Sequence, residues 1–286
     1  AAPSAADASA PPAHAEMEVE VGDANDEMLN ELVLPFRLHR NLRVRATRLY
    51  ECLLISGLSA GDSYHVVFEV FSPPRVTAAM RTMPHLSLSG GSSFDLAADE
   101  NGVSGDSTRA EDRQRCRARV LAEKPFLVVG SPPCTLFSAL QNLSKQRNQE
   151  RYAARLAEAR VLLRFVTEIY AIQLAGGRHF LHEHLIGASS WKEACIDRLR
   201  RDPRVSEVSC DQCQFGLVTP GAGGSPAPAR KRTRFMSSSP EILARLDKRC
   251  PGNHAHQELL SGRAAAAAIY PDELVRAIIM GAEDQR

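Results

Sequence analysis

Residues 126–138, FLVVGSPPCTLFS, place a short apolar run directly before two prolines and a cysteine. The run at residues 126–129 is typical of a parallel strand that is covered on both faces. Proline fixes φ and lacks a backbone donor, so Pro132 and Pro133 must end the strand and hold Cys134 in a stiff turn. Ligands of open α/β sheets bind at the carboxyl ends of the strands, and the thiol is therefore predicted to face a binding crevice. An unpaired cysteine is also commonly a small buried hydrophobe, and the spacing alone leaves both interpretations open.

Strand and helix patterns alternate through the rest of the chain. Short apolar or alternating runs predict strands at residues 64–71, 90–96, 126–129, 178–184, 205–210 and 234–237. Helical spacing predicts helices at residues 75–82, 111–123, 148–175, 191–201, 240–248 and 270–280. Residues 220–229, rich in Gly, Ser and Pro, are predicted to form a flexible loop. The alternation predicts an α/β fold with a doubly wound, mostly parallel sheet.

The first 30 residues differ in composition from the rest. They are acidic and rich in Ala and Pro, which predicts a disordered arm, whereas residues 31–286 are predicted to form a single α/β domain with a small C-terminal part at about residues 205–262. Eight acidic residues and no Lys or Arg fall within residues 1–32, so residues 33–286 hold 35 basic and 26 acidic residues, a formal charge of +9. This surplus is compatible with a nucleic-acid partner, and a solvated arginine-rich surface is the alternative cause.

Cysteine content and hydropathy bear on location. No run approaches the roughly 18 apolar residues of a membrane span, and no signal-peptide pattern is present, so no membrane partner is predicted. Seven scattered cysteines, an odd number, indicate a reducing intracellular compartment, nuclear or cytoplasmic. The chain starts without a methionine, which we interpret as a sign that it is part of a longer polypeptide.

Glu183 is the acidic residue that the predicted sheet brings closest to Cys134. It lies at the end of the strand after the Cys134 strand, with one helix between them, and such strand ends are neighbours in a doubly wound sheet. A thiolate favoured by nearby cations is a plausible nucleophile, and a carboxyl with a raised pKa can donate a proton near neutrality. The alternative for Glu183 is an acid that caps a helix or pairs with arginine.

The segment GSPPCTLFS at residues 130–138 resembles the proline-cysteine loop of the cytosine-5 DNA methyltransferases. More closely, six segments in order resemble the methyltransferase-like segment of retroelement (retrotransposon) polyproteins. They are FSPPRV at 71–76, GGSSFDL at 90–96, GSPPCTLFSALQNL at 130–143, FLHEHLIGASSW at 180–191, DQCQFGL at 211–217 and CPGNHAH at 250–256. The resemblance spans roughly residues 62–281. It implies a Rossmann-like, S-adenosylmethionine-dependent methyltransferase fold and DNA methylation.

The resemblance also implies roles for single residues. Cys134 would attack C6 of a cytosine flipped out of the nucleic acid, Glu183 would hydrogen-bond its N3 and exocyclic amine, and Pro133 would rigidify the loop.

The resemblance implies cofactor contacts as well. Phe71 and Ser72 would lie beside the methionine part of S-adenosylmethionine, Asp95 would bond the ribose hydroxyls and Asp106 would match the acid near the adenine.

Two departures from the family pattern leave alternatives open. The family's glycine-rich turn is replaced by residues 72–75, Ser-Pro-Pro-Arg, which favours a second hypothesis: a catalytically inactive, methyltransferase-derived module of a mobile-element polyprotein that binds nucleic acid or is structural. The family's Gln-x-Arg-x-Arg segment survives at residues 231–234, Lys-Arg-Thr-Arg. Arg232 and Arg234 could hold the loop and the nucleic acid, or form a basic surface run.

Cysteine and histidine also gather near the C-terminus. Cys213, Cys250, His254 and His256 are the four residues that could complete a tetrahedral zinc site. Their order and long separation fit no standard zinc finger, and buried thiols with surface histidines are the alternative.

Overall fold

A computed structural model describes residues 66–98, 102, 104–138, 141, 148–221, 224–259 and 267–286. All of them belong to one compact unit, Ser59–Arg286. The predicted arm at residues 1–30, and the predicted domain start after it, lie outside the described residues.

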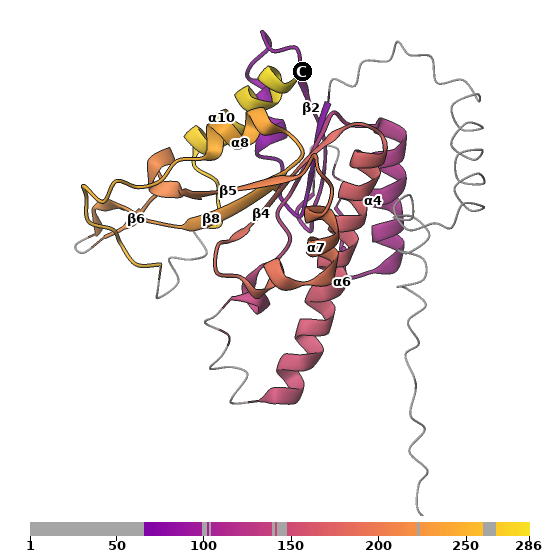
Figure 1. The fold of residues 1–286 in the computed structure, drawn as a ribbon, viewed down its shortest axis with the longest axis horizontal. Coiled ribbons are helices and arrows are strands. Elements are labelled where there is room, and N and C mark those ends of the chain that lie inside the picture. The colour runs from indigo at the N-terminus through magenta and orange to yellow at the C-terminus, as the bar shows by residue number, and fades with distance from the viewer. Residues whose placement is uncertain are drawn as a thin grey trace, which may run out of the picture. The chain divides into compact units, whose positions relative to one another are not determined.

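A six-stranded sheet forms the centre of this unit, with the strand order β2-β1-β3-β4-β8-β5 (Figure 1). Four neighbouring strands are parallel, and β8 runs antiparallel to both β4 and β5. The sheet is therefore mostly parallel, as the sequence predicts. The strands are β1 Val66–Val70, β2 Ser89–Phe94, β3 Leu127–Gly130, β4 His179–Leu185, β5 Ser206–Asp211 and β8 Arg232–Ser237.

Helices cover both faces of the sheet (Figure 1). One apolar core lies between the sheet and α4 (Ala110–Glu123), α6 (Gln149–Ala175) and α7 (Ala194–Arg200). The second core lies between the opposite face and α3 (Val76–Arg81), α8 (Pro240–Leu246) and α10 (Asp272–Gln285). The doubly wound arrangement is thus confirmed.

Among the described residues, no helix is both long enough and apolar enough to cross a membrane.

The strand order reverses beside β1. The chain passes from β1 to β2 on one side and then returns to place β3 on the other side of β1. The carboxyl ends of β1 and β3 therefore flank the topological switch point, where open α/β sheets bind their ligands. Cys134 follows β3, so its predicted place at this edge is confirmed.

Two predicted elements differ from the structure. The helix expected at residues 191–201 is split into a 3-10 turn, Ser189–Lys192, and α7, because Glu193 between them has extended dihedrals (φ −72°, ψ 140°). The loop expected at residues 220–229 contains strand β7 (Pro226–Pro228), which pairs antiparallel with β6 (Val218–Pro220). Prolines are tolerated in this two-stranded sheet because every strand in it is an edge strand.

Candidate functional site

The Cys134 loop is held by a buried histidine from the neighbouring strand. Cys134 precedes a 3-10 turn, Thr135–Phe137, whose Phe137 ring is buried. The Nε2 atom of His184 lies 2.9 Å from the Pro132 carbonyl oxygen, and its Nδ1 atom lies 2.6 Å from Ser190 Oγ. Because a carbonyl can only accept, Nε2 carries the proton and Nδ1 accepts from Ser190. His184 therefore ties the proline turn to β4.

Glu183 is the buried acid of the site. Its side chain is 8% exposed, and Lys231 Nζ lies 3.3 Å from its Oε1 atom. The Lys231 ammonium, which carries three N–H donors, is thus the charged partner of this oxygen. A carboxylate can accept several hydrogen bonds, so Glu183 keeps acceptor capacity for a ligand beside this ion pair.

Cys134 and Glu183 act on each other electrostatically. Burial raises the pKa of the Cys134 thiol, and the negative charge of Glu183 raises it further, whereas the charge of Lys231 lowers it. The thiol also meets the backbone of Leu185, two residues beyond Glu183. Cys134 and Glu183 therefore lie close enough to interact at the carboxyl ends of β3 and β4, and the thiol is protonated at neutral pH.

Tyr270 contacts this group of side chains from the segment before α10. Its hydroxyl lies 2.6 Å from Ser131 Oγ, and its ring lies under the Lys231 ammonium at 5.9 Å. Burial raises the pKa of Tyr270 well above its usual value, and Glu183 adds to the effect. The group thus holds one buried pair of opposite charges, Glu183 and Lys231, beside a neutral phenol and a neutral thiol.

Phe71 and Ser72 occupy the turn after β1. Phe71 has a positive φ of 60°, and its ring packs edge-on against Phe165 at 6.1 Å. Ser72 Oγ lies 2.9 Å from the Pro73 carbonyl oxygen and 3.4 Å from the buried carboxylate of Glu69. Packing holds the strained backbone of Phe71, and both residues directly follow the carboxyl end of β1.

The carboxylate of Glu69 accepts hydrogen bonds from backbone donors of the same turn. Its Oε2 atom accepts from the backbone N–H groups of Arg75 and Thr77, both at 2.9 Å, and from Thr77 Oγ1 at 2.7 Å. Because prolines precede Arg75, few backbone donors remain for an incoming anion. One guanidinium nitrogen of Arg75, Nη1, is buried and has no hydrogen-bond partner among the described residues.

Asp95 and Asp106 follow β2. Asp95 Oδ1 accepts from the Ala97 backbone at 3.2 Å, which leaves its carboxylate at the carboxyl end of β2 with one contact inside its own turn. Asp106 Oδ1 accepts from the backbone and the hydroxyl of Thr108, and these bonds lower the pKa of Asp106. Asp106 has an evident structural task in the turn before α4.

Arg232 and Arg234 lie on β8 and are engaged within the chain. Arg232 Nε lies 3.6 Å from Asp211 Oδ1. Arg234 pairs with Glu207 at 3.2 Å and stacks on the Trp191 ring at 5.0 Å. Side chains alternate across a strand, so Lys231, Thr233 and Phe235 share the other face, and Lys231 is the cation beside Glu183.

Sequence reasoning did not assign Lys231, His184 or Tyr270 to the site. Alternation along residues 231–235 was the signal that could have separated Lys231 from its two arginine neighbours. No comparable signal exists for Tyr270, because it reaches the site from nearly 90 residues beyond Glu183 in the chain.

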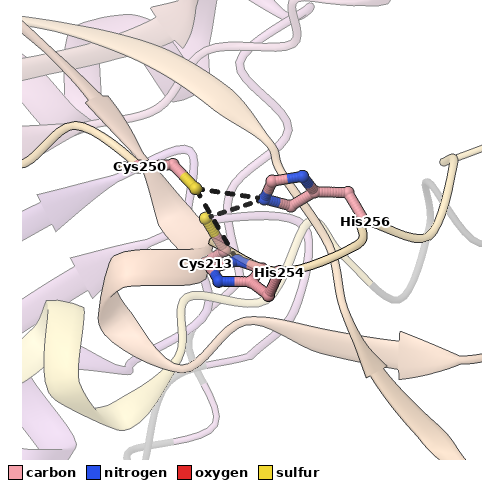
Figure 2. A group of neighbouring side chains, drawn as sticks. All are labelled: Cys213, Cys250, His254 and His256. Carbon is pink, nitrogen blue, oxygen red and sulfur yellow. Dashed lines mark hydrogen bonds between the residues drawn. The ribbon is translucent and has the colours of Figure 1, made fainter. Parts of the chain in front are cut away.

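A second cluster consists of cysteine and histidine side chains (Figure 2). Cys213, Cys250, His254 and His256 each offer one ligand atom, and these atoms all lie within 4.8 Å of one another. The structure thus assembles the four residues that the sequence predicts. Cys210, by contrast, is buried in the second core, between the sheet and α3, α8 and α10.

Comparisons with known proteins give no family or curated match and a weak structural similarity. No protein-family model and no curated protein matches the chain. Among solved structures, the chain is similar to the Entamoeba histolytica methyltransferase EhMeth, with a TM-score of 0.40 and 13% sequence identity. The match covers 62% of this chain and 53% of the chain of that protein.

Proposed function

We propose that the domain is an S-adenosylmethionine-dependent methyltransferase that modifies cytosine in DNA at C5. The observation that carries the proposal is the meeting of Cys134 with Glu183 and Lys231 at the switch-point edge of the sheet. A thiol near a buried carboxylate is the pair that the resemblance implies for attack on a cytosine.

The chain's own residues would divide the work as follows. The Cys134 sulfur, after its proton has passed to solvent, would form a bond to C6 of the flipped cytosine as the C5–C6 double bond opens. Once C5 carries the methyl group, loss of the C5 proton to solvent would re-form the double bond and break the bond between sulfur and C6. Glu183 would accept a hydrogen bond from the exocyclic amine through its carboxylate, and this contact would orient the ring. His184 would position the thiol by holding the Pro132 carbonyl.

Substrate binding would also ionise the thiol. The charge of Glu183 opposes the Cys134 thiolate in the free protein. A cytosine that donates a hydrogen bond to the Glu183 carboxylate would offset this negative charge and thereby lower the pKa of Cys134. The thiolate would therefore form when the cytosine is bound.

The residues after β1 and β2 fit the methyl donor in part. S-adenosylmethionine, when bound, would supply the methyl group for C5, held by Phe71, Ser72, Asp95 and Asp106. The backbone donors of Arg75 and Thr77 are already taken by Glu69, which leaves fewer donors for the carboxylate of the methyl donor.

A second candidate function has its own observation. The Pro-Pro turn and the occupied donors of Arg75 and Thr77 favour a domain that has lost methyl transfer and binds nucleic acid or is structural. The formal charge of +9 on residues 33–286 is compatible with nucleic-acid binding in either case.

Calorimetric titration with S-adenosylmethionine separates the two functions. We expect saturable binding, followed by a covalent adduct with an oligonucleotide that contains 5-fluorocytosine. The adduct should be lost in Cys134→Ala and kept in Cys195→Ala, a matched change of a half-buried cysteine on α7. No heat of binding at millimolar cofactor, together with no adduct, would establish the inactive module instead.

A further inference from the structure

We propose that Cys213, Cys250, His254 and His256 bind one zinc ion in a closed, structural site. Cys250 Sγ lies 3.7 Å from His254 Nε2 and 3.4 Å from His256 Nε2, and Cys213 Sγ lies 3.4 Å from His256 Nε2. A tetrahedral ion with Zn–S bonds of about 2.3 Å and Zn–N bonds of about 2.0–2.1 Å separates sulfur from nitrogen by about 3.6 Å. The three sulfur-to-nitrogen distances agree with this geometry (Figure 2).

The four groups have little reason to converge without an ion. A thiol is a weak donor and its sulfur a weak acceptor, so contacts among two thiols and two imidazoles replace the hydrogen bonds to water poorly. The described cysteines are all free, so no disulfide accounts for the approach of Cys213 to Cys250. A shared cation is the simplest bond partner for all four.

Neighbouring groups already orient the ligands. His254 Nδ1 lies 2.9 Å from Asn253 Oδ1, and an N–H donated to that oxygen leaves the Nε2 lone pair directed at the cluster. The backbone N–H of Gly252 donates to Cys250 Sγ at 3.3 Å, which stabilises a thiolate there. Partners of this kind are typical of metal ligands, which need a fixed tautomer and a fixed ring orientation.

The donor set selects zinc. Two thiolates and two neutral imidazoles balance the charge of a divalent ion, and sulfur with nitrogen in a tetrahedron is typical of zinc. All four positions come from the protein, which leaves no open position for a water or a substrate. The role we infer is therefore structural.

The ion would fasten two segments of the chain together. Cys213 lies in the 3-10 turn after β5, whereas Cys250 and the two histidines lie in the loop after α8. Gln257, the next residue after His256, donates its backbone N–H to the Pro228 carbonyl at 2.7 Å. The site thus joins the β6–β7 hairpin to the edge of the main sheet.

Lys231, which pairs with Glu183, lies in the chain that follows β7. Gln212, adjacent to Cys213, donates its backbone N–H to the Lys231 carbonyl at 3.1 Å, and Ala229 pairs with Gln257. Residues 229–231 are thereby held on two sides by chain that the ion would fix. Loss of zinc is expected to loosen the Lys231 side chain that meets Glu183.

Metal analysis tests the site without reference to methyl transfer. The wild-type chain, purified under reducing conditions and dialysed, is expected to retain one zinc ion per chain by mass spectrometry of the native protein. Cys250→Ser should lose it, while Cys195→Ser should keep it. Cobalt substitution should give the visible absorption of a tetrahedral site with thiolate ligands, which a loosely attached ion would not produce.

Chelation of the wild-type chain avoids any dependence on a variant that folds poorly. A strong zinc chelator should lower the melting temperature of the wild type, and added zinc should restore it. Sub-stoichiometric zinc after dialysis against buffer containing zinc, or equal zinc in Cys250→Ser, would overturn the proposal. Since these measurements use neither S-adenosylmethionine nor DNA, failure of the zinc site and failure of the proposed function are distinguishable.

Discussion

Burial and two charges of opposite sign govern the ionisation of the Cys134 thiol. The two charged residues are Glu183 on β4 and Lys231 directly before β8, and they lie 3.3 Å apart. Burial is the largest of the three influences and favours the neutral thiol. The Cys134 thiol is therefore protected from non-specific oxidation and alkylation, because the thiolate is the reactive form.

Replacement of Glu183 should make Cys134 more reactive. Glu183→Gln removes the negative charge that raises the pKa of the thiol, so the pKa should fall and the rate of alkylation by iodoacetamide at pH 7.5 should rise several-fold. The measurement is peptide mapping of Cys134 over a pH series. Glu207→Gln, on β5 and paired with Arg234, serves as the control. An alkylation profile that does not move in Glu183→Gln would show that the two side chains are not coupled.

At the scale of elements, α3 and β2 approach each other through a glycine. A Cβ atom at Gly90 would meet the Thr77 carbonyl oxygen at 2.1 Å and the Thr77 carbonyl carbon at 2.8 Å. These are backbone atoms, and Thr77 is itself fixed by two hydrogen bonds to Glu69. The turn after β1 therefore depends on the close packing of its helix on β2.

Gly90→Ala should destabilise the domain. Overpacking of this kind costs about 1–3 kcal/mol, because the helix must move away from the strand. At this chain length each kcal/mol lowers the melting temperature by about 2–4 °C. Differential scanning calorimetry measures the shift. Gly187→Ala, where an added Cβ meets no atom within 4 Å, is the matched control, and an equal melting temperature in both variants would contradict the packing argument.

The whole domain depends on imidazoles that are buried in the neutral form. His182 is fully buried between Tyr170 and Trp191, and burial lowers the pKa of His182 well below its usual value. Burial also lowers the pKa of His184, which is held by Pro132 and Ser190. The imidazoles of His182 and His184 therefore bind protons in the unfolded chain at a pH at which they remain neutral in the folded domain.

Acid should weaken the fold before its carboxylates are protonated. A histidine whose pKa is lowered by folding contributes its full stability above the unfolded pKa, and loses it as the pH falls from about 6.5 toward the folded pKa, with a slope of up to about 1.4 kcal/mol per pH unit for each group. Urea unfolding between pH 8 and pH 5 should show this fall. The slope should be smaller in His184→Asn and unchanged in His85→Asn, which alters an exposed histidine. A slope in His184→Asn equal to that of the wild type would show that His184 does not contribute to the pH dependence of stability.

Several elements follow from local sequence alone. Ser239 caps α8 by accepting from the Ile242 backbone, and Asn148 caps α6 in the same way, as their residue types favour. The split at Glu193 could not be predicted, because Trp191 is held by a hydrogen bond to the Leu185 carbonyl that forms only in the folded chain. The β6–β7 pair was missed because its prolines are typical of loops and become strand residues only at an exposed edge.

The sequence by itself determined the alternation of strands and helices, the stiff turn that carries Cys134, and the four residues of the cysteine-histidine cluster. These are properties of local spacing and of residue chemistry. Tertiary structure alone decided that β8 enters the sheet antiparallel, and that Lys231, rather than Arg232 or Arg234, faces Glu183. Strand pairing sets which face each side chain occupies, and that choice depends on contacts between segments far apart in the chain.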